Sequence, residues 1–454
     1  MVHPEVRRLA VAWWAALASA GAASHSIAAQ SSDAFPCHSP KARFLGAQAT
    51  LIGQSLRPFS AEYSGAHSLT SAGDQQLSQS YGVYGGACIV AGLAVYVDVE
   101  MVRGAGIGRT LGLAGITNGD VLRAGSVDLG TGPYFARYFL RYTIPLSSKS
   151  EDTLTAAPDQ LAGHVSSRRI EITAGRLALT DLLDLNRYAN STRSQFYDWV
   201  LFNDGAWDYA ADTRGYSTGL AVAWVNPTWV LRVASFMMPT MANGNVFDTD
   251  IANARGDNVE LTLALPHESV LRILAYVNHG RMGIYSDAIA TGIANDTTPN
   301  IVADDAPGRV KYGFAVNGDV PLADSGETGA FGRIGWNDGK TESFVFTEQD
   351  SHLSLGFQLS GRHWRRHDDA WAIAFVTGGI SQDHRAYLAA GGLGFLLGDG
   401  ALNYGRENIL ETYYRATFWS HVIVSPDFMY IVNPGYNRAR GPAVVFGLRL
   451  NVHT

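Results

Sequence analysis

Alternation of apolar and polar side chains is the dominant pattern in this chain. It is clearest in residues 93–101, 259–265, 353–360 and 444–453, where apolar residues occupy every second position. Successive side chains of a β-strand point to opposite faces of the sheet, so this period of two predicts strands with one apolar and one polar face. The only stretch with a helical period is a short one within 181–190.

Sixteen segments fit the strand pattern, an even number, as in bacterial single-chain outer-membrane barrels. The segments are 45–54, 80–86, 88–101, 133–145, 168–176, 216–225, 227–237, 257–265, 269–280, 309–317, 328–337, 350–360, 370–381, 409–419, 420–431 and 442–453. Several joins between them are short, whereas four are long and rich in Gly, Asp, Asn and Ser, namely 102–132, 177–215, 281–308 and 381–408. Short turns at one end and long loops at the other are typical of such barrels.

A soluble β-sandwich would show the same alternation. However, a sandwich protein of roughly 430 residues would need several domains with linkers, and no shift in composition marks a linker. Aromatic residues also gather near the expected strand ends, as in the girdles of membrane barrels, and they include Trp224, Trp229, Trp336, Tyr413 and Trp419. These features predict an all-β fold, a transmembrane antiparallel β-barrel of about 16 strands over residues 45–454, with long extracellular loops and short periplasmic turns.

The N-terminus predicts export from the cytoplasm. Arg7 and Arg8 precede an apolar, small-residue stretch at 11–23, and small-residue cleavage sites follow. This arrangement is that of a secretory signal peptide, over residues 1–29, since the apolar stretch is too short to cross a bilayer comfortably. We expect export through the Sec pathway, a periplasmic N-terminal segment at 30–44, and a final location in the bacterial outer membrane.

Charge, cysteines and motifs narrow the chemistry. The net charge of −7 argues against nucleic acid as a partner, because nucleic acid requires a basic face. The only cysteines are Cys37 and Cys88, which can pair in an oxidising periplasm, although sequence does not supply the geometry that a disulfide requires. No C-x-x-C, H-E-x-x-H, P-loop or G-x-S-x-G motif occurs. We therefore expect no catalytic residue and no cofactor, and the sequence leaves metal binding open.

The barrel prediction assigns an inner face to the polar positions of the strands. If the apolar positions meet lipid, the interleaved charges must point inward, because Arg or Lys on the lipid face costs ~2–4 kcal/mol at the midplane. Barrels of this size enclose an aqueous channel, so the charges would sit in a hydrated lumen or pair with neighbours on the wall. The candidate pore-lining residues on the strands are Asp98, Glu100, Arg137, Arg141, Glu260, Arg272 and Arg333.

The long connection at 175–215 differs from the rest of the chain, because it crowds carboxylates, arginines and aromatic rings together. Polar groups beside flat aromatic faces suit sugars, whereas clustered carboxylates suit hard divalent cations. An ordinary solvated extracellular loop could have the same composition. The candidate selectivity residues here are Asp181, Asp184, Asn186, Asp204, Trp207, Asp208 and Arg214.

Three parts of the chain carry a family resemblance. They are AGRLALTDLLDLNRYAN and NDGAWDYAADTRGY within 174–216, YLAAGGLGFLLGDGALNYGRENILETYY at 387–414, and SPDFMYIVNPGYNRARGPAVVFGLRL at 425–450. The chain resembles the carbohydrate-selective porin (OprB) family of Gram-negative outer membranes over roughly residues 45–452. The resemblance implies a sixteen-stranded passive porin with a preference for neutral sugars. Some branches of that family are manganese-selective, and the chain resembles them as well.

The chain departs from the family pattern at its end. Family members commonly end in an aromatic residue that helps the assembly machinery recognise the last strand, whereas this chain ends Asn451-Val452-His453-Thr454. The departure bears on the efficiency of assembly and leaves the expected fold unchanged.

We therefore expect an outer-membrane porin for passive diffusion of small hydrophilic solutes, with carbohydrates as the preferred class, and not an enzyme. A divalent-cation (Mn²⁺) porin of the same fold is the first alternative. A barrel-borne hydrolase or adhesin is the second, although the sequence offers no credible Ser–His pair. The expected partners are outer-membrane lipid and small sugars or divalent cations, in a monomer or a homotrimer.

Overall fold

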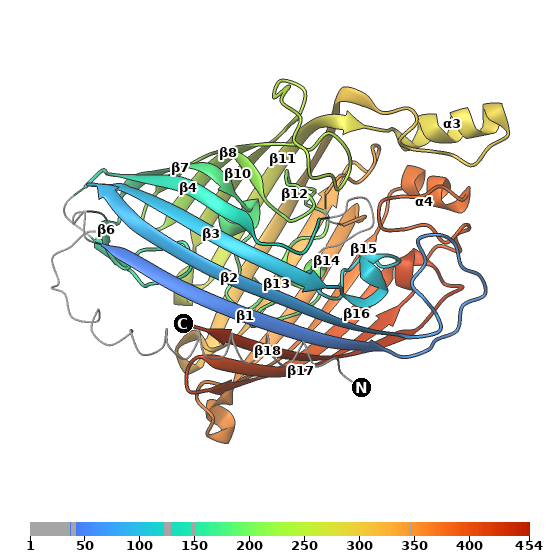
Figure 1. Cartoon of the computed structure of the whole chain (residues 1–454). Helices are drawn as coiled ribbons and strands as arrows, with labels where there is room; N and C mark the ends of the chain where they lie inside the picture. Colours follow the sequence, from blue (N-terminus) through green and yellow to red (C-terminus); the bar gives the residue numbers. More distant parts are fainter. Residues whose placement is uncertain (1–36, 38–41, 122–128, 148–150, 346) are drawn as a thin grey trace.

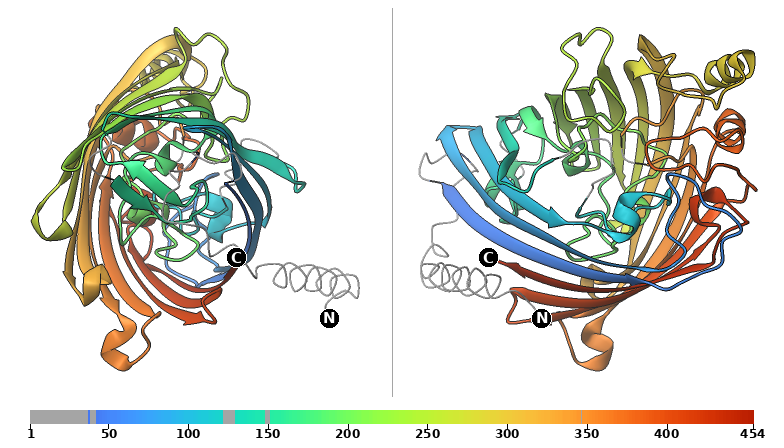
Figure 2. Two further views of the ribbon diagram at one scale, coloured as in Figure 1. Left: turned by 90° about the vertical axis from the view of Figure 1, so that its left-hand side faces the viewer. Right: turned by 45° about the vertical axis from the view of Figure 1, so that its right-hand side comes forward.

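A closed antiparallel β-barrel forms the body of the protein (Figures 1 and 2). The computed structural model describes residue 37 and residues 42–121, 129–147, 151–345 and 347–454, so the expected signal peptide lies outside the described residues. Within them, sixteen strands follow one another around the barrel in chain order, and β18 closes on β1. The fold class predicted from the alternation is confirmed.

Most barrel strands lie within a few residues of their predicted positions. The first eight are β1 (Arg43–Leu56), β2 (Asp74–Val90), β3 (Leu93–Gly104), β4 (Tyr134–Pro145), β7 (Arg169–Leu177), β8 (Ser217–Val225), β9 (Trp229–Met237) and β10 (Arg255–Ala264). The second eight are β11 (Val270–Met282), β12 (Ala306–Ala323), β13 (Thr328–Asn337), β14 (Ser351–Ser360), β15 (Ala370–Gly379), β16 (Glu407–Phe418), β17 (Val422–Val432) and β18 (Ala443–His453). Two more strands, β5 (Glu151–Leu154) and β6 (Gly163–Ser166), form a separate hairpin.

Helical structure is confined to the connections. It consists of α2 (Trp199–Phe202), α3 (Tyr285–Asn295), α4 (Gln382–Ala389) and the 3-10 turns η2 (Ile107–Thr110), η3 (Leu179–Asp181), η4 (Pro266–Glu268), η5 (Asp324–Gly326), η6 (Gly361–Trp364) and η7 (Pro434–Tyr436). The sequence missed α2, α3 and α4, and the helix considered at 181–190 is absent, since of these residues only Asp181 belongs to the turn η3. Among the described residues, no helix is long and apolar enough to cross a membrane.

The boundary between the second and third strands was predicted wrongly. The sequence predicted that one strand ends at residue 86 and that the next begins at Cys88, whereas β2 continues to Val90. The turn between β2 and β3 instead uses Gly92, whose φ of 78° lies in the left-handed region that favours glycine. Alternation alone could not locate this turn, because the apolar positions continue past Cys88 without a gap.

The outer face of the barrel is apolar and the inner face is polar. Along β3, β10 and β14, the apolar side chains Val97, Val259 and Leu355 are exposed on the outside, whereas their neighbours Asp98, Glu260 and Ser354 are buried. This is the arrangement that lipid on the outside requires. One aromatic assigned to an interfacial girdle is misplaced, because Tyr413 is buried inside the barrel.

The two ends of the barrel differ in the length of their connections. The short turns, such as those at 226–228 and 419–421, lie at one end with the two termini of the barrel, which marks that end as periplasmic. The connections that carry α3 and α4 lie at the opposite, extracellular end (Figure 1). One periplasmic connection breaks the pattern: residues 146–168 are long and carry the β5–β6 hairpin.

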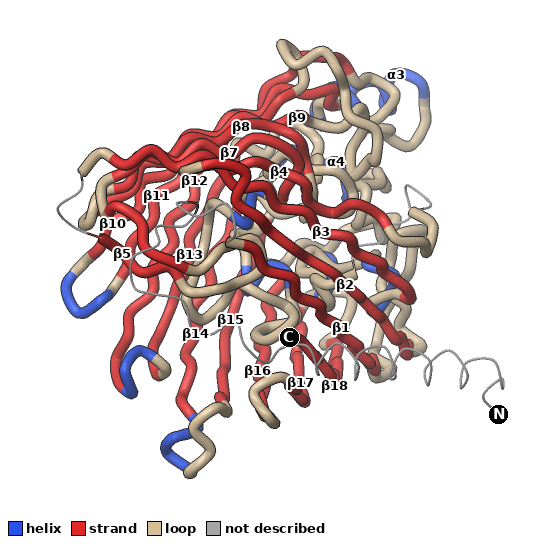
Figure 3. Tube along the Cα trace, turned by 60° about the vertical axis from the view of Figure 1, so that its left-hand side comes forward, coloured by secondary structure: helices blue, strands red, loops and turns tan. Residues whose placement is uncertain are grey.

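Residues 178–216, between β7 and β8, fold back into the barrel, and we call them the internal segment. Figure 3 shows loop segments enclosed by the strands. The side chains of Phe196, Tyr197 and Leu201 in the internal segment are fully buried. Much of the lumen is therefore packed with protein. The expectation of a lumen simply filled with water was therefore too broad.

Glycines on the wall make room for this packing. A Cβ at Gly335 in β13 would lie 2.0 Å from Oδ1 of Asp204, and one at Gly329 would lie 2.1 Å from the hydroxyl of Tyr188. Such close approach of a side chain to a strand backbone is possible only at glycine. Some of the chain's 49 glycines thus allow contact between the wall and the internal segment.

Candidate functional site: an off-centre channel

The internal segment leaves a cavity inside the barrel, on the side of the N-terminal strands. The cavity has a volume of about 980 Å³ and is lined by β1 to β4, by β17 and β18, by the internal segment and by the β5–β6 hairpin. Its charged lining residues are Asp98, Glu100, Asp120, Arg137, Arg141, Asp159, Asp181, Arg193 and Arg214. Strands β10 to β16 contribute no side chain to it.

Arg137 joins three parts of the protein at this cavity. Its Nε and Nη2 each donate to one oxygen of Asp181 in the internal segment, both at 2.7 Å. Its Nη1 donates to Asp98 on the neighbouring strand at 3.2 Å, and its Nε lies 3.4 Å from Asp159 in the hairpin. The bidentate geometry with Asp181 is the strong, directional form of an arginine–carboxylate contact.

A second charged group lies around Glu100 on β3. Arg193 of the internal segment donates to Glu100 at 2.9 Å and to Asp120 at 2.7 Å. The hydroxyls of Tyr216 and Tyr134 also donate to Glu100, at 2.6 and 3.1 Å. The carboxylate is therefore held by one guanidinium and two phenols, and the tyrosine rings are brought to the edge of the cavity.

The other two cavity arginines lie over aromatic rings. The guanidinium of Arg214 is 4.1 Å from the ring centre of Tyr134. Arg141 lies 5.3 Å from the ring centre of Tyr96 and 5.4 Å from that of Phe139, and it donates to the backbone oxygen of Asp159 at 3.0 Å. Guanidinium groups in such positions are stabilised by the ring quadrupole and keep donors available toward the cavity.

The cavity is nearly neutral because its charges compensate one another. Five carboxylates face four guanidinium groups among the described lining residues. Each of these five side-chain carboxylates lies within 4 Å of an arginine nitrogen, through Arg137 or Arg193. A passing solute therefore meets many hydrogen-bonding groups and little net charge.

The candidate residues divide into two groups. Those that line the cavity are Asp98, Glu100, Arg137, Arg141, Asp181 and Arg214. Those that do not line it are Asp184, Asn186, Asp204, Trp207, Asp208, Glu260, Arg272 and Arg333. The second group is buried in contacts that fasten the internal segment to the wall or pair charges within the wall.

Arg333 on β13 is the main fastening point of the internal segment. It is fully buried, and its Nε donates to both oxygens of Asp184 at 3.1 Å. Its other nitrogens donate to the backbone oxygens of Leu201, Ala189 and Phe202 at 2.8 to 3.1 Å. A single arginine thus satisfies several otherwise unpaired carbonyl groups of the segment.

The remaining contacts of this group extend the attachment along β10 to β12. The amide of Asn186 donates to Asn317 at 2.7 Å, and Glu260 accepts the backbone N–H of Asp184 at 2.8 Å. Arg272 pairs with Asp319 at 2.8 Å, a contact within the wall. The segment is therefore attached to β10, β12 and β13, and the backbone N–H groups of Tyr197 and Asp198 attach it to Glu411 on β16. The cavity lies beside β1 to β4.

The second half of the internal segment is fastened in the same way. Trp207 donates its indole N–H to Asn258 at 2.9 Å, and Asp208 pairs with Lys311 at 3.2 Å. Asp204 accepts the backbone N–H of Ala206 at 2.8 Å. Burial raises the pKa of Asp204 to about 8, with a further contribution from the carboxylate of Asp184.

Sequence reasoning missed four residues of the cavity. Asp120, Asp159, Arg193 and the ring of Tyr216 all take part in the contacts described above. They lie in connections, where period-two alternation gives no information on facing. A Pro158-Asp159 pair in the connection 146–168 is a turn signal that could have drawn attention to the hairpin.

Cys37 and Cys88 are joined by a disulfide bond that closes a sequence separation of 51 residues. The bond ties Cys37 to the periplasmic end of β2. The sequence left open whether the two cysteines pair.

A closed barrel with an apolar exterior and a polar, charge-lined cavity defines a channel of the bacterial outer membrane, a porin. The chain matches the family model "Carbohydrate-selective porin, OprB family" over residues 90–453. It therefore belongs to that family, as the resemblance predicted.

One solved structure supports the same fold. The high-pH structure of Pseudomonas putida OprB is 11% identical, and the match covers 91% of this chain and 94% of that chain with a TM-score of 0.65. The outer membrane channel DcaP of Acinetobacter baumannii is 9% identical, with 91% and 97% covered and a TM-score of 0.49. No curated protein sequence matches the chain.

Proposed function

We propose that this porin passes small neutral polar solutes, carbohydrates above all, by passive diffusion through the cavity beside β1 to β4. The observation that carries the proposal is the compensation of charge, since each cavity carboxylate lies within 4 Å of an arginine nitrogen. A free ion gains little from such a lining, whereas a polyhydroxylated solute can exchange hydrogen bonds with guanidinium, carboxylate and phenol groups.

The aromatic residues at the cavity support the same substrate class. Tyr134 and Tyr216 contribute rings beside Glu100, and their ring centres lie 6.4 Å apart. Flat rings next to hydrogen-bonding groups suit the apolar faces and the hydroxyls of pyranoses. The family description of carbohydrate selectivity points in the same direction.

The divalent-cation alternative finds less support in this cavity. Hard cations favour several oxygen ligands that are free to coordinate, and the carboxylates here are engaged by arginine. Across the part of the chain that the structure describes, no group of three or more His, Cys, Asp or Glu side chains could hold a metal ion. The hydrolase or adhesin alternative gains no support, because the family and the fold are those of a channel.

The proposal also covers the absence of a catalytic step and the oligomeric state. Passive diffusion requires no catalytic step, and we assign the protein none. One chain closes its own barrel and encloses its own cavity, so either a monomer or a homotrimer embedded in outer-membrane lipid would conduct. Light scattering of the protein in detergent, corrected for bound detergent, distinguishes the two.

Liposome swelling tests the substrate class. Vesicles containing the purified protein are transferred into isotonic glucose, gluconate or glucosamine, solutes of similar size that differ in charge. The proposal predicts the fastest swelling with glucose. Equal rates for all three solutes, or a higher rate for either charged one, would contradict it.

A further inference from the structure

The periplasmic connection 146–168 enters the channel. Its hairpin is paired from Glu151↔Ser166 to Leu154↔Gly163, and its loop continues into the cavity, where residues 156–160 form part of the lining. Other periplasmic turns are short, for example 91–92 and 324–327. A long connection at the short-turn end is therefore an addition to the barrel that the closing of the sheet does not require.

The tip of the hairpin is a tight turn with a defined shape. Ala157 and Gln160 exchange backbone hydrogen bonds at 3.0 and 3.2 Å. Pro158 and Asp159 occupy the two central positions, and Asp159 has a φ of 61°. Proline favours the first of these positions, and Asp is among the few residues other than glycine that tolerate a positive φ. The turn therefore presents the Asp159 carboxylate at a fixed place.

Two arginines of β4, the strand from which the connection leaves the barrel, contact this tip. The carboxylate of Asp159 lies 3.4 Å from Nε of Arg137, and its backbone oxygen accepts from Arg141 at 3.0 Å. Arg137 is the same residue that holds Asp181 of the internal segment. The segment that enters from the outside and the hairpin that enters from the periplasm thus meet on one guanidinium.

The base of the hairpin is anchored independently of the channel. Asp152 accepts from Arg169 at the start of β7 at 3.0 Å and from the hydroxyl of Ser167 at 2.8 Å. These contacts tie the hairpin to the rim of the barrel.

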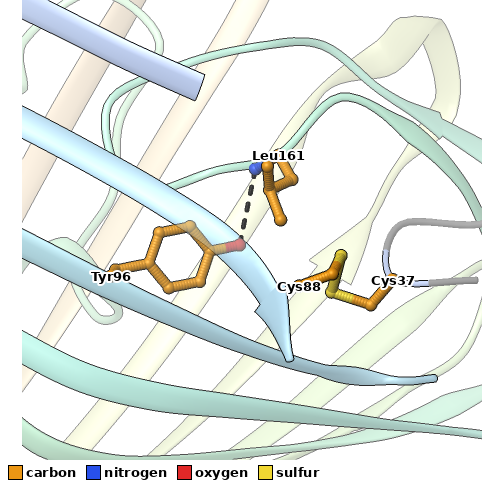
Figure 4. The surroundings of a disulfide bond; sticks show 4 residues. All are labelled: Cys37, Cys88, Tyr96 and Leu161. Atoms are coloured by element: carbon orange, nitrogen blue, oxygen red, sulfur yellow. Dashed lines mark hydrogen bonds between the residues drawn. A yellow bond between two sulfur atoms is a disulfide. The ribbon is translucent and has the colours of Figure 1, made fainter. Parts of the chain in front are cut away.

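The back of the tip rests on the disulfide region (Figure 4). The backbone N–H of Leu161 donates to the hydroxyl of Tyr96 at 3.4 Å, and the Leu161 side chain is buried in the same apolar cluster as Cys37 and Cys88. The disulfide fixes Cys37 against β2, so it also supports the apolar cluster that includes Leu161. The hairpin is therefore fixed at its base, its tip and its back.

We propose that the β5–β6 hairpin is a second selectivity element, which narrows the channel from the periplasmic side, and that Asp159 is a specificity-determining residue for permeation. This inference rests on the proposed function, because it assumes that solutes cross this cavity. In such a channel, the internal segment and the hairpin together set the largest solute that passes. Asp159 supplies one of the negative charges that balance Arg137 and Arg141.

Shortening the hairpin tests its effect on size. Residues 151–166 are replaced by a short Gly-Ser linker, which can close the connection because the N–H of Leu146 donates to the carbonyl of Arg168 at 2.7 Å. Planar-bilayer recording is expected to show a larger single-channel conductance, and liposome swelling is expected to admit longer oligosaccharides. The matched control shortens the periplasmic turn 361–369, which does not line the cavity, and should leave both quantities unchanged.

A point substitution tests Asp159 without removing the hairpin. Asp159→Asn keeps a residue that tolerates positive φ and removes the charge, so the reversal potential in a KCl gradient is expected to shift toward chloride. Glu268→Gln, in an exposed turn at the same end, is the control and should not move it.

The outcomes separate the two proposals. If the native protein conducts and both the shortened hairpin and Asp159→Asn behave like it, the inference about the hairpin is overturned and the proposed function stands. If the native protein forms no channel, the proposed function itself fails. Should the shortened variant not fold, Asp159→Asn alone decides.

Discussion

At the scale of single residues, Arg137 has the largest influence on the channel. Asp98, Asp159 and Asp181 come from three different parts of the chain and share this one cation. Like charges brought together without a counter-charge repel each other strongly at low dielectric. The contacts that Asp181 of the internal segment and Asp159 of the hairpin make with β4 therefore depend on this guanidinium.

Replacing Arg137 with Gln should make the channel more cation-selective. The substitution removes one positive charge from a lining with five carboxylates and four guanidinium groups, so cations are attracted and anions are repelled. The reversal potential of the single channel in a KCl gradient measures the change, which should be toward potassium. Arg255→Gln, at a pair with Asp257 outside the cavity, is the control, and an equal shift in both variants would refute the assignment.

Asp204 should make the internal segment less stable at alkaline pH. Burial raises its pKa from 3.8 to about 8, so the folded state favours the protonated form. The stability that this provides is complete below the unfolded-state value and is lost as the pH rises through about 8. Hydrogen exchange of residues 178–216 should therefore be faster at pH 9 than at pH 6, and Asp204→Asn should reduce that difference. A native protein whose exchange protection is the same at both values, after correction for intrinsic rates, would contradict this account.

Alternation along the strands was sufficient to predict which charged residues face inward, but it could not predict which of them reach the channel. Arg141 and Arg333 follow the same pattern, yet Arg141 lines the cavity and Arg333 is buried beneath the internal segment. The difference depends on where residues 178–216 fold, and their sequence shows no period that would place them. For the same reason, the sequence could not show that most candidate residues of that segment lie outside the cavity, in contacts that attach the segment to the barrel wall.

At the scale of elements, the barrel strands and the connections follow different rules. The strands obey a single constraint, lipid on one face and polar groups on the other, and this constraint can be read from each strand alone. The helices α3 and α4 lie against each other although they are far apart in the chain, and the β5–β6 hairpin is held by side chains of the strands that flank it. The hairpin at a periplasmic turn was not foreseen for this reason.

Removing the charge of Arg333 should loosen the internal segment and leave the barrel closed. Arg333→Met leaves the buried carboxylate of Asp184 without its partner, a change that costs about 3–5 kcal/mol for pairs of this kind. Hydrogen exchange within 178–216 should increase and single-channel current noise should rise. The double variant Asp184→Asn with Arg333→Met removes both charges and should recover part of the protection, and a double variant as unstable as the single one would contradict the pairing.

At the scale of the whole molecule, the barrel separates three environments. Lipid surrounds it, the internal segment and its packing occupy one side of the lumen, and the cavity occupies the other side. A narrow channel is thus obtained from a wide barrel without a change in the number of strands. The sequence predicted which side chains face lipid, but it did not distinguish the residues packed against the internal segment from those that line the cavity.

An arginine on the outer face should destabilise the whole barrel. Val277 in β11 is 39% exposed and faces outward, so Val277→Arg should lower the free energy of unfolding in lipid vesicles by up to ~2–4 kcal/mol, depending on its depth in the bilayer. Urea titration followed by tryptophan fluorescence measures the change. Ile293→Arg, on the exposed helix α3, is the control, and equal losses in the two variants would show that Val277 does not meet lipid.

The central claim is that neutral polar solutes cross the membrane through the cavity beside β1 to β4. The most direct measurement is the single-channel current of the purified protein in KCl, recorded while glucose is added and, separately, while Mn²⁺ is added. The account predicts that glucose reduces the current in a saturable way in the native channel, that Arg137→Gln weakens this block, and that Mn²⁺ has little effect. A current that glucose leaves unchanged and that Mn²⁺ blocks would contradict it.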